Sequence, residues 1–318
     1  MYSFSTIRSF IVHINSLNKT LRIINSRNKK KMKILWQVSF RPLNKSKSND
    51  NMQSRFIDNI KKFDADITFS ITQFDDYGVK NFLKKKKIKK KFFNHPKKLL
   101  PKNSKYSNSI MLKNSLNYYI KKNFDYFIFS NADILISKKI INILKLVETK
   151  DYMGFIYPNT LIKNGKEVSS FTPHYGIDFI AFKLTKKKAK LFLKLLKNYE
   201  QYNWGVIDNF YIAAGEALGM NFQNLYKEIK VKKIENKFKD FNESRAWQIE
   251  SWKKNNYFFK KFLRKNNLSI LYSAGSYYYL LFKIFRAKDM NLKLFIIYAR
   301  FYFLFPFQLI KKILKTIF

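Results

Sequence analysis

The sequence predicts an α/β fold in which a mostly parallel sheet is flanked by helices. Short apolar runs alternate with segments of helical spacing between Met32 and about Arg245, an order typical of parallel sheets with helical crossovers. Polar residues directly follow several of these runs, as they do at the carboxyl ends of strands that bind ligands. With 46% apolar and 18% aromatic residues, the chain can bury a large core, which excludes a disordered protein.

Each element is expected from its own pattern. In the segment 51–63, Met52, Phe56, Ile60 and Phe63 recur at helical spacing. The expected helices are 51–63, 106–123, 138–149, 185–202 and 204–219. The expected strands are 33–40, 65–74, 125–130, 152–159 and 175–184. The Lys-rich stretch 83–103 has two prolines and no clear period, so we expect a loop there.

The chain divides into three parts by composition. Residues 1–31 contain no acidic residue and precede the first expected strand, so they are expected to be an N-terminal extension, with Met32 an alternative start to Met1. Residues 32–252 are expected to form the α/β domain. Residues 253–318 are basic, aromatic and apolar, which predicts amphipathic helices that lie on a membrane surface; packing on the domain and a span over Leu294–Ile310 remain alternatives.

The charge of the chain restricts its partners. The net charge is +42, but only nine of the 63 basic residues are arginine, the side chain suited to bidentate phosphate and base recognition. Specific nucleic-acid binding is therefore not expected, whereas nucleotide phosphates and anionic lipids are. The chain has no cysteine, which excludes disulfides and thiolate metal sites, and its three histidines are scattered.

One polar break stands out in the sequence. The strand "DYFIFS" ends in "SNAD", which places Asn131 and Asp133 where the apolar pattern predicts core. Asp133 either caps a helix beginning at "ILISKKI" or binds something outside the protein. Ser39 and Asp75 also follow expected strands, and the carboxyl ends of parallel strands share one edge of a sheet.

Four motifs, in order, resemble the glycosyltransferases of GT-A fold, the nucleotide-diphospho-sugar transferases. "SNAD" resembles their DxD region, and "MLKNSLNYYIKKN" resembles the helix that precedes it. "HYGIDFIAFK" resembles a G-x-D-x-x-x-F strand, and "WGVIDNFYIAAGEALG" resembles a W-x-x-D-N helix start. The resemblance covers about Met32 to Arg245 and implies a GT-A, Rossmann-like, mixed and mostly parallel sheet.

The resemblance also implies roles for single residues. Asp133 would hold a divalent metal, Mn²⁺ or Mg²⁺, which neutralises the diphosphate leaving group. Asp208 would be the general base of an inverting enzyme, and Asp178 would orient sugar hydroxyls. The residues expected beside the nucleotide and its diphosphate are Ser39, Arg55, Asp75, Lys113, Asn114, Ser130 and Asn131. Asn131 stands where the DxD motif has its first carboxylate, so its NAD form is degenerate.

Structural interpretations of the same residues remain open. Asp178 could belong to a buried ion pair, because an unpaired carboxylate is costly in an apolar strand. Asp208 could cap the helix "NFYIAAGEAL". The run 84–91 is either a solvated loop or a flap over the donor phosphates.

The function expected from the resemblance is transfer of a sugar from a nucleotide-sugar donor to a glycan or lipid-linked acceptor. The expected setting is cell-surface polysaccharide or lipopolysaccharide assembly, with the enzyme cytoplasmic and peripherally bound to the anionic inner face of the cell membrane. The alternatives are an inactive GT-A-like scaffold at the membrane, which Asn131 would permit, and a basic nucleic-acid-binding protein.

Overall fold

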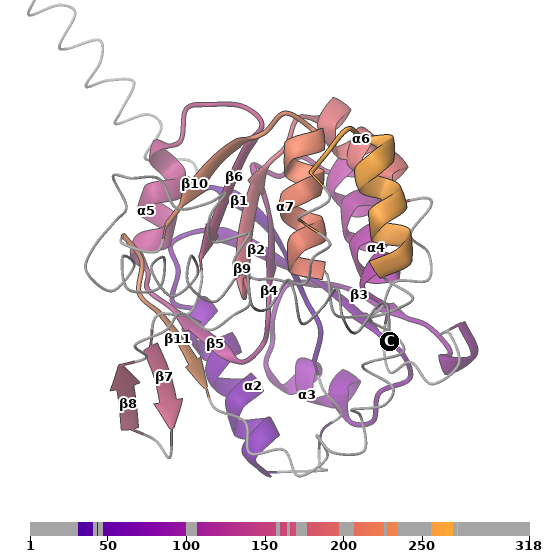
Figure 1. Ribbon diagram of the computed structural model, residues 1–318. Coiled ribbons are helices and arrows are strands. Elements are labelled where there is room, and N and C mark those ends of the chain that lie inside the picture. Colours follow the sequence, from indigo (N-terminus) through magenta and orange to yellow (C-terminus); the bar gives the residue numbers. More distant parts are fainter. Residues whose placement is uncertain are drawn as a thin grey trace, which may run out of the picture.

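The computed structural model describes 31–40, 43, 47–99, 107–156, 160–163, 166–169, 177–196, 207–225, 228–234, 256–269 and 272. These residues form two sheets and the helices around them (Figure 1). Residues 1–30 of the N-terminal extension and residues 273–318 lie outside the described residues.

The main sheet has seven strands in the order β10-β6-β9-β4-β1-β2-β3. Only β9 among them runs antiparallel to its neighbours, β4 and β6, while the other pairs in this sheet are parallel. The strands are β1 (Lys33–Val38), β2 (Asp66–Gln73), β3 (Lys90–Asn94), β4 (Tyr126–Ser130), β6 (Tyr152–Ile156), β9 (Phe179–Lys183) and β10 (Asn221–Asn224). The mixed, mostly parallel sheet predicted from the sequence is confirmed.

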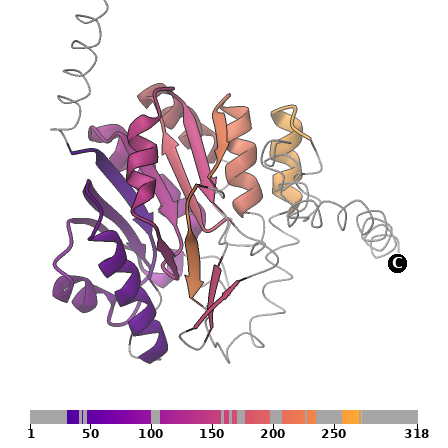
Figure 2. The ribbon, with the colours of Figure 1, turned by 90° about the vertical axis from the view of Figure 1, so that its left-hand side faces the viewer.

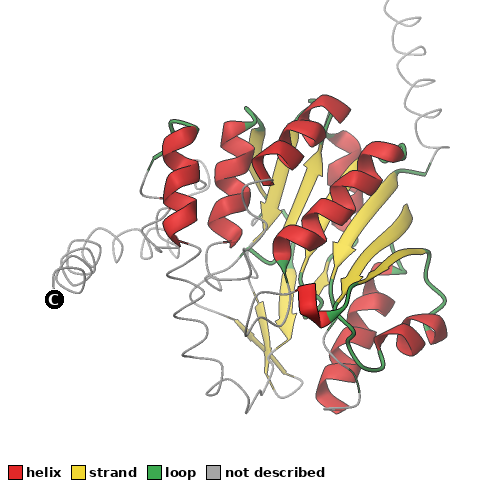
Figure 3. Ribbon diagram, turned by 90° about the vertical axis from the view of Figure 1, so that its right-hand side faces the viewer, coloured by secondary structure: helices red, strands yellow, loops and turns green. Residues whose placement is uncertain are grey.

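Helices cover both faces of this sheet (Figures 2 and 3). One face packs against α4, α6, α7 and a helix over 256–265, and the other against α2, α3 and α5. Strand alternation explains the division, since Leu35 packs in the first core and its neighbour Trp36 in the second. The helices are α2 (Lys47–Ile60), α3 (Val79–Lys85), α4 (Asn108–Lys121), α5 (Lys139–Leu146), α6 (Lys186–Leu196), α7 (Ile207–Ala217) and the short 3-10 helix η1 (Lys97–Leu99).

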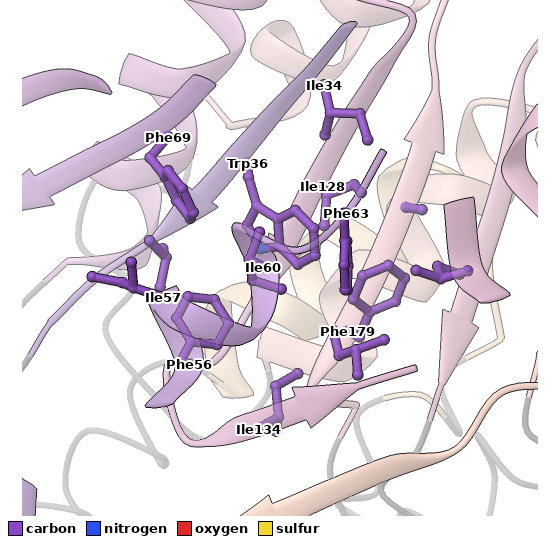
Figure 4. Packing of buried hydrophobic residues seen from close by; sticks show 14 of the residues in the cluster. Ile34, Trp36, Phe56, Ile57, Ile60, Phe63, Phe69, Ile128, Ile134 and Phe179 are labelled. Atoms are coloured by element: carbon purple, nitrogen blue, oxygen red, sulfur yellow. The ribbon is translucent and has the colours of Figure 1, made fainter. Parts of the chain in front are cut away.

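Trp36 lies at the centre of the second core (Figure 4). Its ring is fully buried and contacts those of Phe56 and Phe63, and also that of Phe179 at the start of β9. The indole N–H donates to Ser130 Oγ over 2.7 Å, which satisfies a polar group that burial would otherwise leave without a partner. The core therefore fixes the end of β4, where the candidate site begins.

A second, four-stranded sheet extends the carboxyl edge of the first (Figure 2). Its order is β5-β11-β7-β8, and β11 pairs antiparallel with β5 and parallel with β7. The strands are β5 (Ile134–Ile136), β7 (Thr160–Lys163), β8 (Lys166–Ser169) and β11 (Val231–Ile234). The sequence analysis did not predict these short strands.

The prediction of a loop over 83–103 is wrong in part, because this stretch contains the end of α3, strand β3 and η1. Lys86 pairs with Asp58 of α2 over 2.8 Å, and Lys89 pairs with Asp66 over the same distance. Asp66 is the first residue of β2, so Lys89 is held at the amino end of the strands. A flap over phosphates at the opposite edge is not supported for this lysine.

The first part of the tail packs onto the α/β domain. Phe259, Phe262 and Leu263 are buried in the first core, and the rings of Phe259 and Phe262 contact Phe210 of α7. Tyr272 is also buried, and its carbonyl accepts a hydrogen bond from Asn209 Nδ2 over 2.6 Å. Over the described part of the chain, no helix has both the length and the apolar character needed to cross a membrane. The window Leu294–Ile310 lies outside that part.

Candidate functional site

Four charged side chains meet where the two sheets adjoin. Asp133 follows β4, Asp178 precedes β9, Asp208 lies in the first turn of α7 and Lys233 lies on β11. The carboxylates of Asp178 and Asp133 each lie within 4.0 Å of the Lys233 ammonium. Asp208 interacts electrostatically with Asp178 and Lys233. The structure thus brings together three of the four aspartates selected from the sequence, and the fourth, Asp75, lies elsewhere.

Strand pairing places Asn131 beside Asp178. Ser130 of β4 pairs with Phe179 of antiparallel β9, so the residue after one strand faces the residue before the other. The Asn131 N–H donates to the carbonyl of Asp178 over 3.1 Å, and the Asn131 side-chain amide donates to Asp178 Oδ1. Asn131 therefore binds a neighbouring carboxylate, where a first DxD carboxylate would repel it.

Lys233 completes the group from the second sheet. Pairing of β11 with β5 sets Lys233 opposite Ile134, and the Ile234 N–H donates to the carbonyl of Asp133 over 2.8 Å. The Lys233 Nζ lies 2.8 Å from Asp178 Oδ2 and 4.0 Å from Asp133 Oδ2. The first distance is a charge-assisted hydrogen bond.

Sequence reasoning missed Lys233. A carboxylate buried in an apolar strand requires a cation, and that signal was present at Asp178. The sequence offers 54 lysines as partners, however, and "VKKI" on a short strand does not distinguish Lys233 from its neighbour Lys232.

The environment changes the acidity of two groups. Burial raises the pKa of Asp208 to about 7, and the nearby Asp178 carboxylate adds to the effect. A hydrogen bond from the Ile177 N–H and the charge of Lys233 limit this rise. Burial by itself would lower the pKa of Lys233, but the attraction of Asp178 and Asp133 more than offsets it and raises that pKa above its usual value. Lys233 is therefore an ammonium at neutral pH, and Asp208 is near its midpoint.

The structure decides between several of the alternative interpretations. Asp133 caps no helix, because the residues after it form strand β5 and α5 begins only at Lys139. Asp208 Oδ2 accepts from the N–H of Ile177, 31 residues away, over 3.1 Å, which is a tertiary contact. For Asp178 the ion-pair alternative is present, with Lys233 as its partner.

Ser130 and Ser39 lie at the same edge. Ser130 Oγ accepts the Trp36 indole N–H and is buried, so its orientation is set by the core. Ser39 directly follows β1, whose Gln37 pairs with Phe129 of parallel β4. Continuing that register places Ser39 next to Asn131.

Asp75 and Asn114 belong to a second polar group, at the ends of β2 and β3. Asp75 has a left-handed backbone (φ 51°), and its carboxylate accepts from Asn94 Nδ2 over 2.6 Å. Asn114 Nδ2 lies 2.9 Å from His95 Nε2 and donates to Thr72 Oγ1 over 3.3 Å. Arg55 and Lys113 are exposed on α2 and α4.

The residues at the first group do not fit a divalent metal ion. Where the structure describes the chain, no cluster of three or more His, Cys, Asp or Glu side chains is arranged to hold one. Mn²⁺ and Mg²⁺ prefer several oxygen ligands. Both oxygens of Asp178 already accept hydrogen bonds, one from Asn131 and one from Lys233. An added dication would also stand beside the Lys233 ammonium, which repels it.

Comparison with known proteins gives similarity of structure only. No family model matches the chain, and no curated protein matches its sequence. The mannosyltransferase PcManGT from Pyrobaculum calidifontis, in complex with GDP-Man and Mn²⁺, is 12% identical, with a TM-score of 0.47 over 92% of this chain and 89% of that one. S. aureus TarS 1-349 with UDP-GlcNAc is 10% identical, with a TM-score of 0.48 over 76% and 70%. The inositol-1-phosphate CTP transferase from T. maritima is 11% identical, with a TM-score of 0.40 over 70% and 96%.

These neighbours are nucleotide-sugar glycosyltransferases and a nucleotidyltransferase, and their activities and ligands are their own. The described part of the present chain has an α/β fold, with a mixed, mostly parallel seven-stranded sheet flanked by helices.

Proposed function

We propose that this protein is a glycosyltransferase that moves a sugar from a nucleotide-sugar donor to a hydroxyl of a glycan or lipid-linked acceptor. The observation that carries the proposal is the meeting of Asp133, Asp178, Asp208 and Lys233 at the carboxyl edge of the sheet. In open α/β sheets ligands bind at this edge. Burial of charged groups costs desolvation free energy, so charged groups that are buried at this position are candidates for a functional site.

Asp208 is the proposed general base. Its pKa of about 7 is close to neutral pH, where a base is both deprotonated and able to accept a proton. Asp208 takes the proton of the acceptor hydroxyl while that oxygen attacks the anomeric carbon. The bond from this carbon to the diphosphate breaks, and the nucleoside diphosphate leaves with the electron pair. This role requires an inverting reaction.

Asp133, Ser130 and Asn131 are proposed to lie beside the diphosphate, with Ser39 on the nucleotide side. Asp75 and Asn114 would contact the nucleotide from the second polar group, and Arg55 and Lys113 would contact it only from exposed positions. Both oxygens of Asp178 accept hydrogen bonds from Asn131 and Lys233. We therefore assign Asp178 a positioning role in place of direct contact with sugar hydroxyls.

The divalent metal implied by the sequence resemblance would have to be held at Asp133, and bound there it would neutralise the leaving group. The donor set described above does not fit that ion, so no step of the proposed reaction passes through it.

The proposed setting is cell-surface polysaccharide or lipopolysaccharide assembly at the anionic inner face of the cell membrane. The support is the composition of the tail, which is aromatic and basic from about 268 to 318 and matches an in-plane anchor. A lipid-linked acceptor would be presented at that surface.

A thermal-shift screen of the full chain against UDP- and GDP-sugars tests the function, because a ligand that binds only the folded state raises the unfolding temperature. Sugar release from a stabilising donor, measured with and without acceptor extracts, then separates an enzyme from the inactive scaffold that Asn131 would permit. If no nucleotide sugar stabilises the chain, and nucleic acid binds with a steep salt dependence, the proposal is wrong and the basic-protein alternative is preferred.

A further inference from the structure

We propose that the Lys233 ammonium is the built-in cation of this site and binds the donor diphosphate in the position that a divalent metal would otherwise occupy. The inference rests on the proposed function and specifies how the site would recognise its donor. It predicts a nucleotide-binding site that needs no metal ion.

The position of the ammonium carries the proposal. The Lys233 Nζ lies between two carboxylates, 2.8 Å from Asp178 Oδ2 and 4.0 Å from Asp133 Oδ2. Asp178 accepts a hydrogen bond from Asn131, the position where the degenerate motif lacks a carboxylate, and Asp133 follows Asn131 by two residues in the sequence. Compared with a DxD motif, the site therefore has the Asn131 amide in place of one carboxylate. It also has a cation that the protein supplies, the Lys233 ammonium.

Lys233 also retains the capacity to bind a ligand. An ammonium has three donors, and the hydrogen bond to Asp178 uses one. At 4.0 Å Asp133 is beyond hydrogen-bond distance, and the described residues give Lys233 no second acceptor. The side chain is 16% exposed and that of Asp133 is 12% exposed, so the group is not sealed from solvent. Two N–H donors remain for phosphate oxygens.

Two further observations distinguish Lys233 from its neighbour. Strand alternation turns Lys232 to the other face of β11, where it forms an ion pair with the exposed Glu167. The attraction of Asp178 and Asp133 raises the pKa of Lys233, so the ammonium is stable throughout the neutral range. A lysine is also a common phosphate-binding side chain, acting as a point charge.

A purely structural role for Lys233 makes a different prediction. If the lysine only neutralises Asp178, the folded protein needs it but nucleotide binding does not. A divalent ion would then still be required at Asp133. The two roles can be separated by measuring nucleotide affinity with and without metal.

The experiment is isothermal titration of UDP and of GDP into the full chain, once in excess EDTA and once in excess Mn²⁺. We expect the Kd of the preferred nucleotide to agree within about threefold between the two conditions. Binding that disappears in EDTA and returns with Mn²⁺ overturns the inference but leaves the proposed function standing. Failure of UDP, GDP and their sugars to bind under either condition overturns both.

Variants test the residue itself. Lys233→Met should weaken nucleotide binding by roughly 10- to 100-fold, the loss expected for a charge-assisted hydrogen bond. Lys233→Arg should retain binding in EDTA, and the matched control Lys232→Met should match the wild-type chain. Because Lys233→Met leaves a buried carboxylate without its ammonium, Asp178→Asn/Lys233→Met is measured beside it, with thermal unfolding as the check of folding. Wild-type affinity in either Lys233→Met variant overturns the inference.

A last variant restores the metal ligand. Asn131→Asp/Lys233→Ala removes the ammonium and supplies the missing carboxylate. It should bind Mn²⁺, seen as loss of the free-ion signal in electron paramagnetic resonance, whereas the wild-type chain without nucleotide should not. Mn²⁺ binding of equal affinity by both chains contradicts the inference.

Discussion

The Lys233 ammonium donates to Asp178 over 2.8 Å although 55 residues separate the two in sequence. Lys233 lies on β11 of the second sheet and Asp178 directly precedes β9 of the main sheet, and strand pairing positions Asp178 next to the end of β4 and Lys233 next to β5. The charge balance of the candidate site therefore depends on how the two sheets join. It does not arise from any local motif.

Asp208→Asn should lower sugar transfer by roughly 10²- to 10⁴-fold, the range usual for loss of a general base. The amide keeps the shape of the side chain, and its oxygen can still accept the Ile177 N–H. Donor affinity should therefore stay close to that of the wild-type protein. Steady-state transfer assays and donor titration check the two parts, and near-wild-type transfer would exclude Asp208 as the base.

The rate of transfer should rise with pH and level off above about 7. The base acts in its ionised form, and burial raises the pKa of Asp208 to about 7, so below that value each pH unit should reduce kcat/KM about tenfold. Asp208→Asn should remove this dependence from its residual activity. A profile that stays level down to pH 5 would show that another group titrates.

The same pKa shift has an effect on stability. A carboxyl whose pKa is higher in the folded state keeps its proton between about pH 4 and 7 when the unfolded state has lost it. The unfolding free energy contributed by Asp208 therefore decreases as pH rises through this window. Asp208→Asn, which cannot titrate, should gain stability relative to the wild-type chain over the same window. Denaturant titrations at pH 4.5 and 7.5 measure the difference in unfolding free energy between the two chains. The same difference at both pH values would contradict the raised pKa of Asp208.

Asp133→Ala should abolish donor binding or turnover while leaving the protein folded. Asp133 caps no helix, and alanine preserves the backbone hydrogen bond from Ile234 of β11 to the carbonyl of residue 133. Donor titration and thermal unfolding are measured together on the same sample. Full turnover in a folded variant would show that the carboxylate does not act on the donor, and simple unfolding would show that its role is structural.

The tail should bind anionic liposomes through its own lysines. Lys311, Lys312 and Lys315 fall within five consecutive positions of the sequence, and each lysine near an anionic surface contributes about 1 kcal/mol of binding. Reversal of all three to glutamate should lower sedimentation with phosphatidylserine vesicles at low salt by at least about tenfold.

The matched control reverses Lys186, Lys187 and Lys190 of α6, which are exposed and change the net charge by the same amount. The control should sediment as the wild-type chain does. Equal loss in both variants would show that the overall charge, and not the tail, governs binding.

The strands and helices with strong periodicity could be predicted from the sequence. The runs at β1, β4 and β9 are mainly apolar, β2 alternates apolar and polar residues, and α4, α6 and α7 carry regular apolar faces. Strand β3, "KKFFN", could not be predicted, because it is an edge strand with exposed lysines and only partly buried aromatic residues. The strands of the second sheet, with three or four residues each, are too short to show a period.

Only part of the candidate site could be predicted from the sequence. Asp133 and Asp178 could be selected because a carboxylate in an apolar run is unusual, and Asp208 was selected by the resemblance of its segment to a W-x-x-D-N helix start. The pairing of Asn131 with Asp178 depends on one strand running antiparallel in an otherwise parallel sheet, and the sequence does not encode that direction locally. Arg55 and Lys113 were selected by resemblance, and the structure leaves both exposed.

The late position of β11 in the chain has a consequence during synthesis. Strands β1, β2, β3, β4, β6 and β9 are complete by Lys183, so most of the main sheet can pair while the ribosome is still adding residues to the chain. Lys233 emerges about 50 residues later. Until then Asp178 lacks its ammonium, and the nascent domain holds a carboxylate that disfavours close packing at that edge. Arrival of β11 would be the step that lets the two sheets close, and the candidate site would be among the last parts of the domain to form.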